Sequence, residues 1–340
     1  MDDNLDVIDS VSKPGENYNI TDIANGLGIS PIYAANGVAV AGNLAYENYS
    51  LTKNVYFYLS SDVQEITDQA DLNAVRDNLG GKYILLNDIE LNATDGAAGF
   101  DAEGWQPIGD FDNSFTGIFN GNNHKITNIW ADRATRFVGF FGAIKNAQIK
   151  NLGIEIEEGK EIKSNNEYVG GITGYMRDSA IANSYSIGDI SGTYNVGGIA
   201  GDVYYSNITS SYSSGNIYGN NNFVGGIAGY IDDSSITNNA AINLFVTGNP
   251  SENFVNRIVG QITSGTATNN FALDEMEVKG AVYGGAEDDS NGISKTINDF
   301  KDKSTYETDL GWDFGNDDTH PWEINPDKNN GLPYFYWQNL

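Results

Sequence analysis

The chain has 340 residues, of which 46 are acidic and 18 are basic, so its formal charge is −28 at pH 7. A field of that sign repels phosphate backbones and anionic membranes, which argues against a nucleic-acid-binding protein. The chain has no cysteine, which excludes disulfides, Cys-ligated zinc, iron–sulfur clusters and cysteine nucleophiles.

The chain contains no apolar run of membrane-spanning length. Its start, MDDNLDVIDS, has neither the basic nor the apolar region of a signal peptide. These features predict either a cytosolic protein or a mature form from which a signal peptide has been removed. Residues 1–61 are expected to be an acidic lead-in followed by a small β-rich segment, because β-like phrases there are broken by Asn-Gly and Pro.

Residues 62–130 are predicted to hold a capping helix and the first rungs of a larger body. Apolar spacing predicts the helix from Asp68 to Leu79, with Leu72 and Val75 on its apolar face. Asp68 is the expected N-cap, and Asp71 follows it at capping-box spacing. A single amphipathic helix ahead of stacked strands can cover their open edge and apolar interior.

Residues 131–275 contain a repeated sequence. The openings are VGGITGY at Val169, VGGIAGD at Val196 and VGGIAGY at Val224, spaced 27 and 28 residues apart. A second phrase follows each opening and begins at Ile181, Ile208 and Ile236. Self-similarity at a fixed period is the signature of a solenoid in which each coil stacks on the one before it.

The repeat predicts an all-β fold, a right-handed parallel β-helix. Stacked isoleucines would form an apolar column, and the polar residue two places later would form a ladder of side-chain hydrogen bonds. The predicted ladder residues are Asn128, Asn151, Asn183, Ser210, Asn238 and Asn269.

Residues 276–340 are predicted to form a C-terminal cap. A short helix is expected over Ser294–Lys303, because Thr296 and Asp299 have capping-box spacing. The aromatic residues expected to close the last coil are Trp312, Phe314, Trp322, Tyr334, Phe335, Tyr336 and Trp337.

The VGGIAG-type opening followed by Ile-x-Asn/Ser resembles the GLUG repeat of bacterial secreted and surface proteins. The phrases that resemble its lead-in are Tyr83–Leu91, Trp105–Gly109 and Phe115–Gly121, and those that resemble its ending are Gly311–Phe314, Trp322–Ile324 and Gly331–Tyr334. The resemblance covers residues 60–340. It implies an exported, adhesin-like protein of the kind found in gut Bacteroidetes, so that the missing signal peptide would reflect removal of the leader. Such repeats also occur beside the catalytic domain of immunoglobulin-A-cleaving metallopeptidases, and the family supplies no catalytic residues.

A metallopeptidase of the HExxH class is excluded, because the only histidines are His124 and His320 and neither lies in that motif. Parallel β-helices also support polysaccharide lyases and glycosidases, which keeps a carbohydrate-active enzyme as an alternative. Asp178 and Asp233 share one offset in their repeats, with Tyr205 between them. Ideal stacking would place these acids about 9.6 Å apart, near the wide limit for an inverting pair.

Two acidic phrases of the sequence suggest calcium as a cofactor. Asp110–Ser114 and Asp327–Gly331 begin like calcium loops, but the twelfth positions hold Gly121 and Gln338 instead of a bidentate glutamate. We therefore expect no cofactor, with calcium as the alternative.

Tyrosines at the coil corners offer a binding surface or, alternatively, shield the coil edges. The candidate ligand-binding residues are Tyr204, Tyr205, Tyr218, Tyr230, Asp178 and Asp233. We expect a non-catalytic extracellular or cell-surface protein that binds a host or neighbouring-cell glycan or surface protein in adhesion. The alternatives are the carbohydrate-active enzyme and a structural spacer or appendage subunit.

Overall fold

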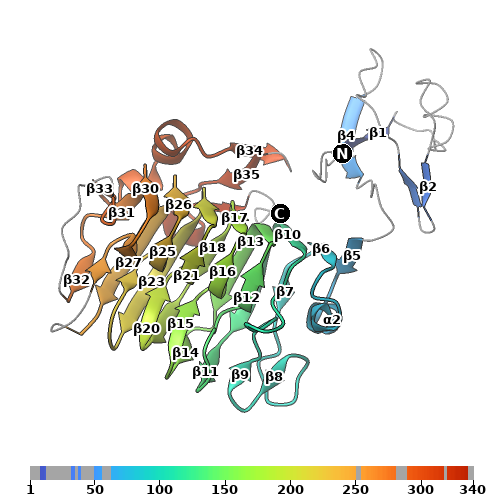
Figure 1. The fold of residues 1–340 in the computed structure, drawn as a ribbon. Coiled ribbons are helices and arrows are strands. Elements are labelled where there is room, and N and C mark those ends of the chain that lie inside the picture. The colour runs from blue at the N-terminus through green and yellow to red at the C-terminus, as the bar shows by residue number, and fades with distance from the viewer. Residues whose placement is uncertain are drawn as a thin grey trace. The chain divides into compact units, whose positions relative to one another are not determined.

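A computed structural model describes residues 63–249, 254–280, 289–317 and 320–335, together with the backbone of four earlier strands (Figure 1). The chain divides into two compact units, Met1–Val63 and Gln64–Leu340. In the first unit, β1 (Ile8–Ser12) pairs with β4 (Ser50–Val55), and β2 (Ile32–Ala34) pairs with β3 (Gly37–Ala39). Both pairs are antiparallel. The rest of the predicted β-rich segment lies outside the described residues.

The second unit is the predicted parallel β-helix, a solenoid of about six coils. Its strands form five stacks, each pairing in parallel with its equivalent in the next coil. The first stack holds β6 (Lys82–Leu85), β10 (Ile118–Ile129), β13 (Gln148–Ile156), β17 (Ala180–Ala182), β22 (Asn207–Thr209), β26 (Ser234–Thr237) and β30 (Gly265–Thr268). The second holds β7 (Ile89–Glu90), β10, β13, β18 (Tyr185–Ile187), β23 (Tyr212–Gly219), β27 (Ala240–Thr247), β31 (Phe271–Leu273) and β33 (Ile293–Lys295).

The other three stacks complete the coil. The third holds β11 (Ala131–Arg133), β14 (Glu161–Ser164), β19 (Asp189–Gly192), β23, β27 and β32 (Glu277–Lys279). The fourth holds β15 (Glu167–Gly170), β20 (Tyr194–Gly197), β24 (Val224–Gly225) and β28 (Val255–Asn256). The fifth holds β12 (Phe141–Lys145), β16 (Thr173–Arg177), β21 (Ala200–Tyr204), β25 (Ala228–Asp232) and β29 (Val259–Ile262).

The repeat places like residues on like, as predicted. Ile149, Ile181, Ile208 and Ile236 pair in register along the first stack, and each is 0–1% exposed. The valines of the openings form a second buried column in the fourth stack. Continuous columns of this kind make the coil interior one apolar core.

The continuous side-chain ladder lies one residue after the predicted column, in which Asn269 donates to the Asn238 side chain at 2.7 Å. Asn151, Asn183, Ser210, Asn238 and Asn269 occupy left-handed corners, with φ between 46° and 61°. The continuous ladder is formed by Ser184, Ser211, Asn239 and Asn270, each of which is fully buried. Each of these side chains accepts a hydrogen bond from the backbone N–H of its equivalent in the previous coil, at 3.0–3.2 Å. The prediction assumed that side chains alternate between two faces, as they do in a continuous strand. The left-handed corner turns the chain, so this alternation ends there and the next residue faces the interior.

Asn128 was wrongly aligned with this column. Its neighbour Ile126 pairs with Ile154, whereas Ile149 pairs with Phe119. Asn128 instead donates a hydrogen bond to Glu90 at 3.1 Å. At this position the apolar-x-Asn pattern belongs to the second stack. The sequence pattern alone does not show which stack a residue belongs to.

A short helix covers the first coil, as predicted. It is α2 (Gln69–Ala74), followed by a 3₁₀ turn over Val75–Asp77, so it ends earlier than expected. Asp68 is the N-cap and accepts from the N–H groups of Ala70 and Asp71 at 2.8 and 2.9 Å. Leu72 and Val75 are fully buried, and β5 (Val63–Ile66) precedes the helix. The N-cap and the apolar face are therefore those that the sequence predicts, whereas the Asp71 carboxylate accepts from Thr67 instead of from the Asp68 N–H.

The aromatic C-terminal cap lies along the flank of several coils (Figure 1). Rings of Trp322 and Phe335 pack on Tyr185, and the Tyr212 hydroxyl donates to the Pro333 carbonyl at 2.9 Å. Trp312 reaches back to donate to the Asn238 carbonyl at 2.7 Å. The strands here are β34 (Phe314–Asp317), β35 (His320–Glu323) and β36 (Tyr334–Phe335). Tyr336 and Trp337 lie outside the described residues.

The predicted helix over Ser294–Lys303 is mostly absent. Its first residues belong to β33, and only a 3₁₀ turn forms at Asp299–Lys301. The capping-box contacts do form, because the N–H of Thr296 donates to Asp299 at 2.7 Å and the N–H of Asp299 donates to Thr296 at 3.1 Å. Pairing of β33 with β31 therefore takes the residues that would have extended the helix.

Candidate functional site

Two columns of mostly aromatic residues stand on the flank formed by the fourth and fifth stacks. The first column precedes the repeated valines and holds Phe137, Tyr168, Asn195, Phe223 and Phe254. The second column lies on the fifth stack and holds Tyr175, Asp202, Tyr230 and Gln261 in register. Both columns change from an aromatic to a polar residue on the same coil, at Asn195 and Asp202.

The aromatic rings contact one another along the columns. Phe137 stacks on Tyr168 with centroids 4.9 Å apart and an interplanar angle of 4°. On the far side of the interruption, Phe223 contacts Tyr230 at 5.5 Å and Phe254 at 5.3 Å. Contacts of this type contribute about 0.5–1.5 kcal/mol each beyond area burial. The two walls are therefore held in place by ring packing on either side of the polar coil.

The interruption opens a groove with a volume of about 560 Å³. Its lining residues are Glu167, Tyr168, Tyr194, Asn195, Asp202, Tyr204, Phe223, Tyr230, Phe254, Gln261 and Thr263. The Tyr204 ring lies 5.8 Å from Tyr175 and 5.7 Å from Tyr230, so it bridges the break in the second column. Asn195, at the break in the first column, is among the residues that line the groove.

Asp202 is the buried acid of this groove. It is 2% exposed, and its Oδ1 has no hydrogen-bond partner among the described residues. Burial raises the pKa of Asp202 to about 7, against hydrogen bonds from Asn195 and the Val203 N–H that lower it. The negative charges of Asp232 and Glu167 raise the pKa further. Near neutral pH this carboxyl group is therefore divided between its two protonation states.

The charged neighbours of Asp202 are already engaged elsewhere. Glu167 pairs with Arg136 at 2.6 Å, and Arg177 pairs with Asp178 at 3.3 Å. Burial, followed by the charge of Asp202, raises the pKa of the Tyr168 hydroxyl. The same two causes raise the pKa of Tyr204 well above its usual value, so both tyrosines stay neutral.

Two of the six predicted ligand-binding residues, Tyr204 and Tyr230, line this groove. Tyr205 is 52% exposed at a left-handed corner, with the Arg177 guanidinium 5.7 Å from its ring centroid. Tyr218 is 40% exposed and lies on the third stack, in register with Ser191. The sequence therefore predicted the residue type that lines the groove. The structure places two of the four tyrosines in the groove, one at a corner and one on the third stack.

Asp178 and Asp233 share a corner column with Tyr205 between them, as their offset predicted, with φ values of 50°, 46° and 48° respectively. Neither acid lines the groove. Asp178 contacts Arg177, and Asp233 accepts a hydrogen bond from the Ser264 hydroxyl at 2.8 Å. The Tyr205 residue occupies the coil between them.

The sequence analysis missed Asp202 and Asn195, although the repeat carries a signal for one of them. The seventh letter of the opening is Tyr in VGGITGY and VGGIAGY, and Asp in VGGIAGD. The seventh residue of each opening belongs to the second column. The change from Tyr to Asp therefore marks the coil on which that column is no longer aromatic. The first column lies directly before the repeated valines, so the shared letters of the openings do not include it.

Of the two suspected calcium loops, the first satisfies its leading carboxylate within its own turn. The Asp110 carboxylate accepts from the N–H groups of Asp112 and Asn113 at 2.9 and 2.7 Å, which closes its own turn. In the second loop, the Asp327 N–H donates to the side chain of Asn325 at 2.9 Å. Within the described residues, no three carboxylate or histidine side chains gather as metal ligands would.

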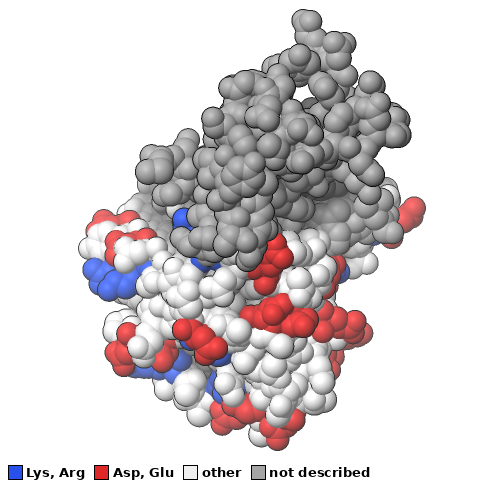
Figure 2. Space-filling model, turned by 90° about the vertical axis from the view of Figure 1, so that its right-hand side faces the viewer, with Lys and Arg blue, Asp and Glu red and all other residues white. Residues whose placement is uncertain are grey.

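Charge is spread over the surface. On the face shown in Figure 2, acidic side chains are scattered over the described part, with Lys and Arg among them. Among the helices of the described residues, none is both long enough and apolar enough to cross a membrane.

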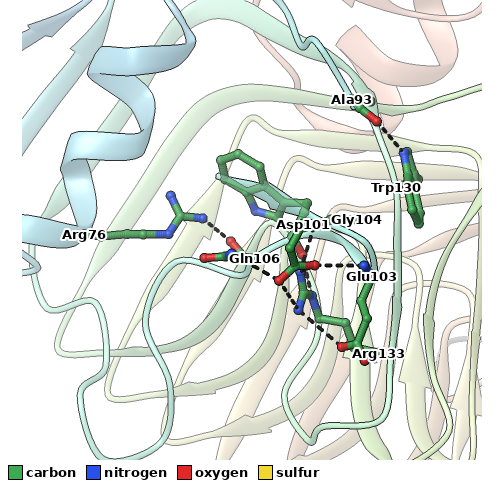
Figure 3. Close-up of polar contacts among 9 residues, drawn as sticks. Arg76, Ala93, Asp101, Glu103, Gly104, Gln106, Trp130 and Arg133 are labelled. Carbon is green, nitrogen blue, oxygen red and sulfur yellow. Dashed lines mark hydrogen bonds and ion pairs between the residues drawn. The ribbon is translucent and has the colours of Figure 1, made fainter. Parts of the chain in front are cut away.

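A second charged cluster, near the N-terminal end of the solenoid, has a structural role (Figure 3). The buried Arg133 donates to the carbonyls of Trp105 and Gly104 at 2.6 and 2.7 Å, and to Asp101 at 2.9 Å. Burial, and then the charge of Arg133, lowers the pKa of Arg76 to about 10, and its guanidinium lies 4.5 Å from the Trp105 ring centroid. The Arg133 contacts join the hairpin of β8 (Phe100–Asp101) and β9 (Gly104–Trp105) to β11.

Comparison with known proteins gives partial matches. No family model matches the chain, so the resemblance to GLUG repeats stays a prediction. The chain is 39% identical over 93 residues to a candidate Gly-rich membrane protein of Evansella cellulosilytica, which covers 26% of this chain and 10% of that protein. It is 35% identical over 97 residues to halomucin of Haloquadratum walsbyi, which covers 27% of this chain and 1% of halomucin. The chain therefore spans a small part of the curated relatives that it matches.

Among solved structures, the chain is similar to a candidate immunoglobulin A1 protease from Bacteroides ovatus. The alignment has a TM-score of 0.57 and 20% identity, and it covers 80% of this chain and 92% of that one. At that identity the similarity concerns the fold. The comparison thus shows that this chain shares the β-helical fold of that protein.

Proposed function

We propose that this chain is a non-catalytic binding scaffold of an extracellular or cell-surface protein, and that its ligand lies in the groove beside Asn195. The observation that carries the proposal is the paired interruption of two aromatic columns on one coil. A uniform wall of rings would only shield the coils, whereas a gap bounded by rings gives a ligand a defined place.

Backbone conformation supports a selected role for these rings. Phe137, Tyr168 and Phe223 have φ values of 62°, 66° and 63°, a region that bulky residues rarely adopt. Asn195 occupies the same column with a φ of 51°, and asparagine tolerates that region well. Aromatic residues at positions where asparagine fits more easily are consistent with strain retained for function.

The location is supported by the partial relatives, whose names describe a Gly-rich membrane protein and a halomucin. A host or neighbouring-cell glycan or surface protein is the ligand class that an exported scaffold of this kind would meet. Exposed aromatic rings suit either class, because they stack on sugar rings and anchor protein side chains.

Glycan and extracellular-protein arrays, probed with the intact protein, test this function. We expect binding that is weakened at least tenfold in a Tyr168→Asn/Phe223→Asn variant, because asparagine fits both corners and removes both walls. A Tyr218→Ala variant removes an exposed tyrosine from another flank and should bind like the natural protein. Blank arrays would favour the structural spacer, and equal binding by the Asn variant would remove the groove from the account.

A further inference from the structure

We propose that the groove receives an alkylammonium group, the chemistry of a lysine side chain on a partner protein, between Tyr168 and Phe223 and against Asp202. This inference rests on the proposed binding function and names the group that is recognised. It follows from the spacing of the walls, the free acceptor atom of Asp202 and the charges around it.

The wall spacing suits a cation. Tyr168 and Phe223 precede valines that are two coils apart, in register with Val196 between them. Strands stack about 4.8 Å apart, so the two positions are separated by about 9.6 Å. Asn195 occupies the position midway between them, so a cation held beside its side chain would lie between the two rings, each of which attracts cations within ~6 Å of its centroid. A lysine stem is one carbon chain thick and can enter such a slot.

The free acceptor favours an ammonium over a guanidinium. Asp202 already receives hydrogen bonds from Asn195 and from the N–H of Val203, and Oδ1 is the atom without a described partner. A guanidinium binds carboxylates best through two parallel hydrogen bonds, whereas an ammonium is a compact point charge that can satisfy one oxygen. A buried carboxylate oxygen that lacks a partner among the described residues therefore matches a single N–H donor.

The surrounding charges also favour a cation. Asp202 faces Glu167 on β15 and Asp232 on β25, together with the hydroxyls of Tyr168, Tyr204 and Tyr230. Of the nearby cations, Arg136 pairs with Glu167 and Arg177 pairs with Asp178. A ligand ammonium would supply the positive charge that Asp202 lacks, in surroundings whose low dielectric strengthens the attraction.

Binding should depend on pH, because only the ionised carboxylate offers a full charge. If Asp202 titrates near neutral pH, the binding-competent fraction rises about tenfold between pH 6 and pH 8. The lysine ammonium, with a pKa of about 10.4, stays charged throughout that range. The apparent Kd should therefore fall by about tenfold over the same interval.

The test is an NMR titration of the intact protein with Nα-acetyl-lysine methylamide at both pH values. The norleucine analogue keeps the carbon stem and lacks the ammonium, and it should bind at least tenfold more weakly. Asp202→Asn should abolish the preference for lysine. Asp233→Asn removes the same charge from a corner outside the groove and should leave the preference intact.

Some results would overturn the inference. These are equal binding of lysine and norleucine analogues, an unchanged preference in Asp202→Asn, or tighter binding of the arginine analogue. Equal binding of glucosamine would reject lysine as the source of the ammonium. If the arrays show groove-dependent binding while the lysine probe fails, the proposed function stands and this inference falls. If the probe binds in the groove while the arrays stay blank, binding in the groove stands, and a glycan or surface protein of the kinds on the arrays is rejected as the ligand.

Discussion

Burial of Asp202 makes the stability of the fold depend on pH. Its pKa is raised from 3.8 to about 7 in the folded chain, so the folded state holds a proton that the unfolded chain releases. The free energy of unfolding is therefore expected to fall as pH rises from about 4 to about 7. A shift of about 3 pKa units corresponds to an upper limit on the order of 4 kcal/mol.

An Asp202→Asn substitution should stabilise the protein at pH 8, because the neutral amide removes the buried charge. We expect a gain on the order of 2–4 kcal/mol at pH 8 that shrinks towards zero near pH 4. Urea unfolding at several pH values measures it. Asp233→Asn, which removes an exposed carboxylate outside the groove, serves as the control. A gain of the same size at both ends of the range would contradict the raised pKa.

Glycine in the openings is required by space. A β-carbon added at Gly197 would lie 2.1 Å from the carbonyl oxygen of Ala200, and φ at this residue is outside the left-handed region. Gly159 is the opposite case, because its φ is +75° and a β-carbon would meet nothing within 4 Å. The repeated glycines therefore let the backbone fold back on itself closely.

These two glycines give a matched pair of substitutions. Gly197→Ala should cost about 3 kcal/mol or more, because the backbone of the next strand has to move. Gly159→Ala should cost only about 1 kcal/mol, the strain of a left-handed alanine. Thermal unfolding of both variants gives the comparison. A smaller loss at Gly197 than at Gly159 would contradict the close approach.

The coil is held together by buried ladders as well as by its apolar columns. Ser211 accepts a hydrogen bond from the Ser184 N–H at 3.1 Å and donates to the Thr209 carbonyl at 2.8 Å. Neighbouring Ser210 occupies the left-handed corner and has a φ of 49°. Adjacent residues of the same type thus have different structural tasks.

Ser211→Ala should destabilise the protein by about 1–3 kcal/mol, because it leaves the Ser184 N–H buried without a partner. Ser210→Asn should be neutral or slightly stabilising, since asparagine suits the corner and occurs at that position in other coils. Chemical denaturation of the two variants checks the assignment. A Ser211→Ala variant as stable as the natural protein would contradict the buried ladder.

Element-level prediction succeeded where local pattern and register agree. Periodic Ile181 and its equivalents predicted the buried column, and Asp68 predicted the start of the helix. The continuous ladder was predicted one residue too early because a left-handed corner interrupts the alternation of side chains along a strand. A repeated residue type in the sequence does not reveal that its backbone is left-handed. The prediction for Asn128 was wrong because the same apolar-x-Asn pattern occurs in two different strand stacks.

At the scale of the molecule, the repeat predicts the solenoid because each coil can bury its apolar face only against an equal neighbour. The C-terminal segment is different, since the contact between Tyr212 and Pro333 joins residues 121 apart in the chain. The groove likewise depends on two columns from separate strands. Tyr204 and Tyr230 could be named from sequence, but their relation to Asp202 needed the fold.

The most direct test of a groove-binding scaffold is 19F NMR of protein labelled with 3-fluorotyrosine, titrated with a ligand found on the arrays. Signals of Tyr168, Tyr204 and Tyr230 should shift, because these rings line the groove. Signals of Tyr205 and Tyr218 should stay in place, and single Tyr→Phe variants assign each resonance. Ligand-dependent shifts at Tyr205 or Tyr218, with none at the groove tyrosines, would contradict the account.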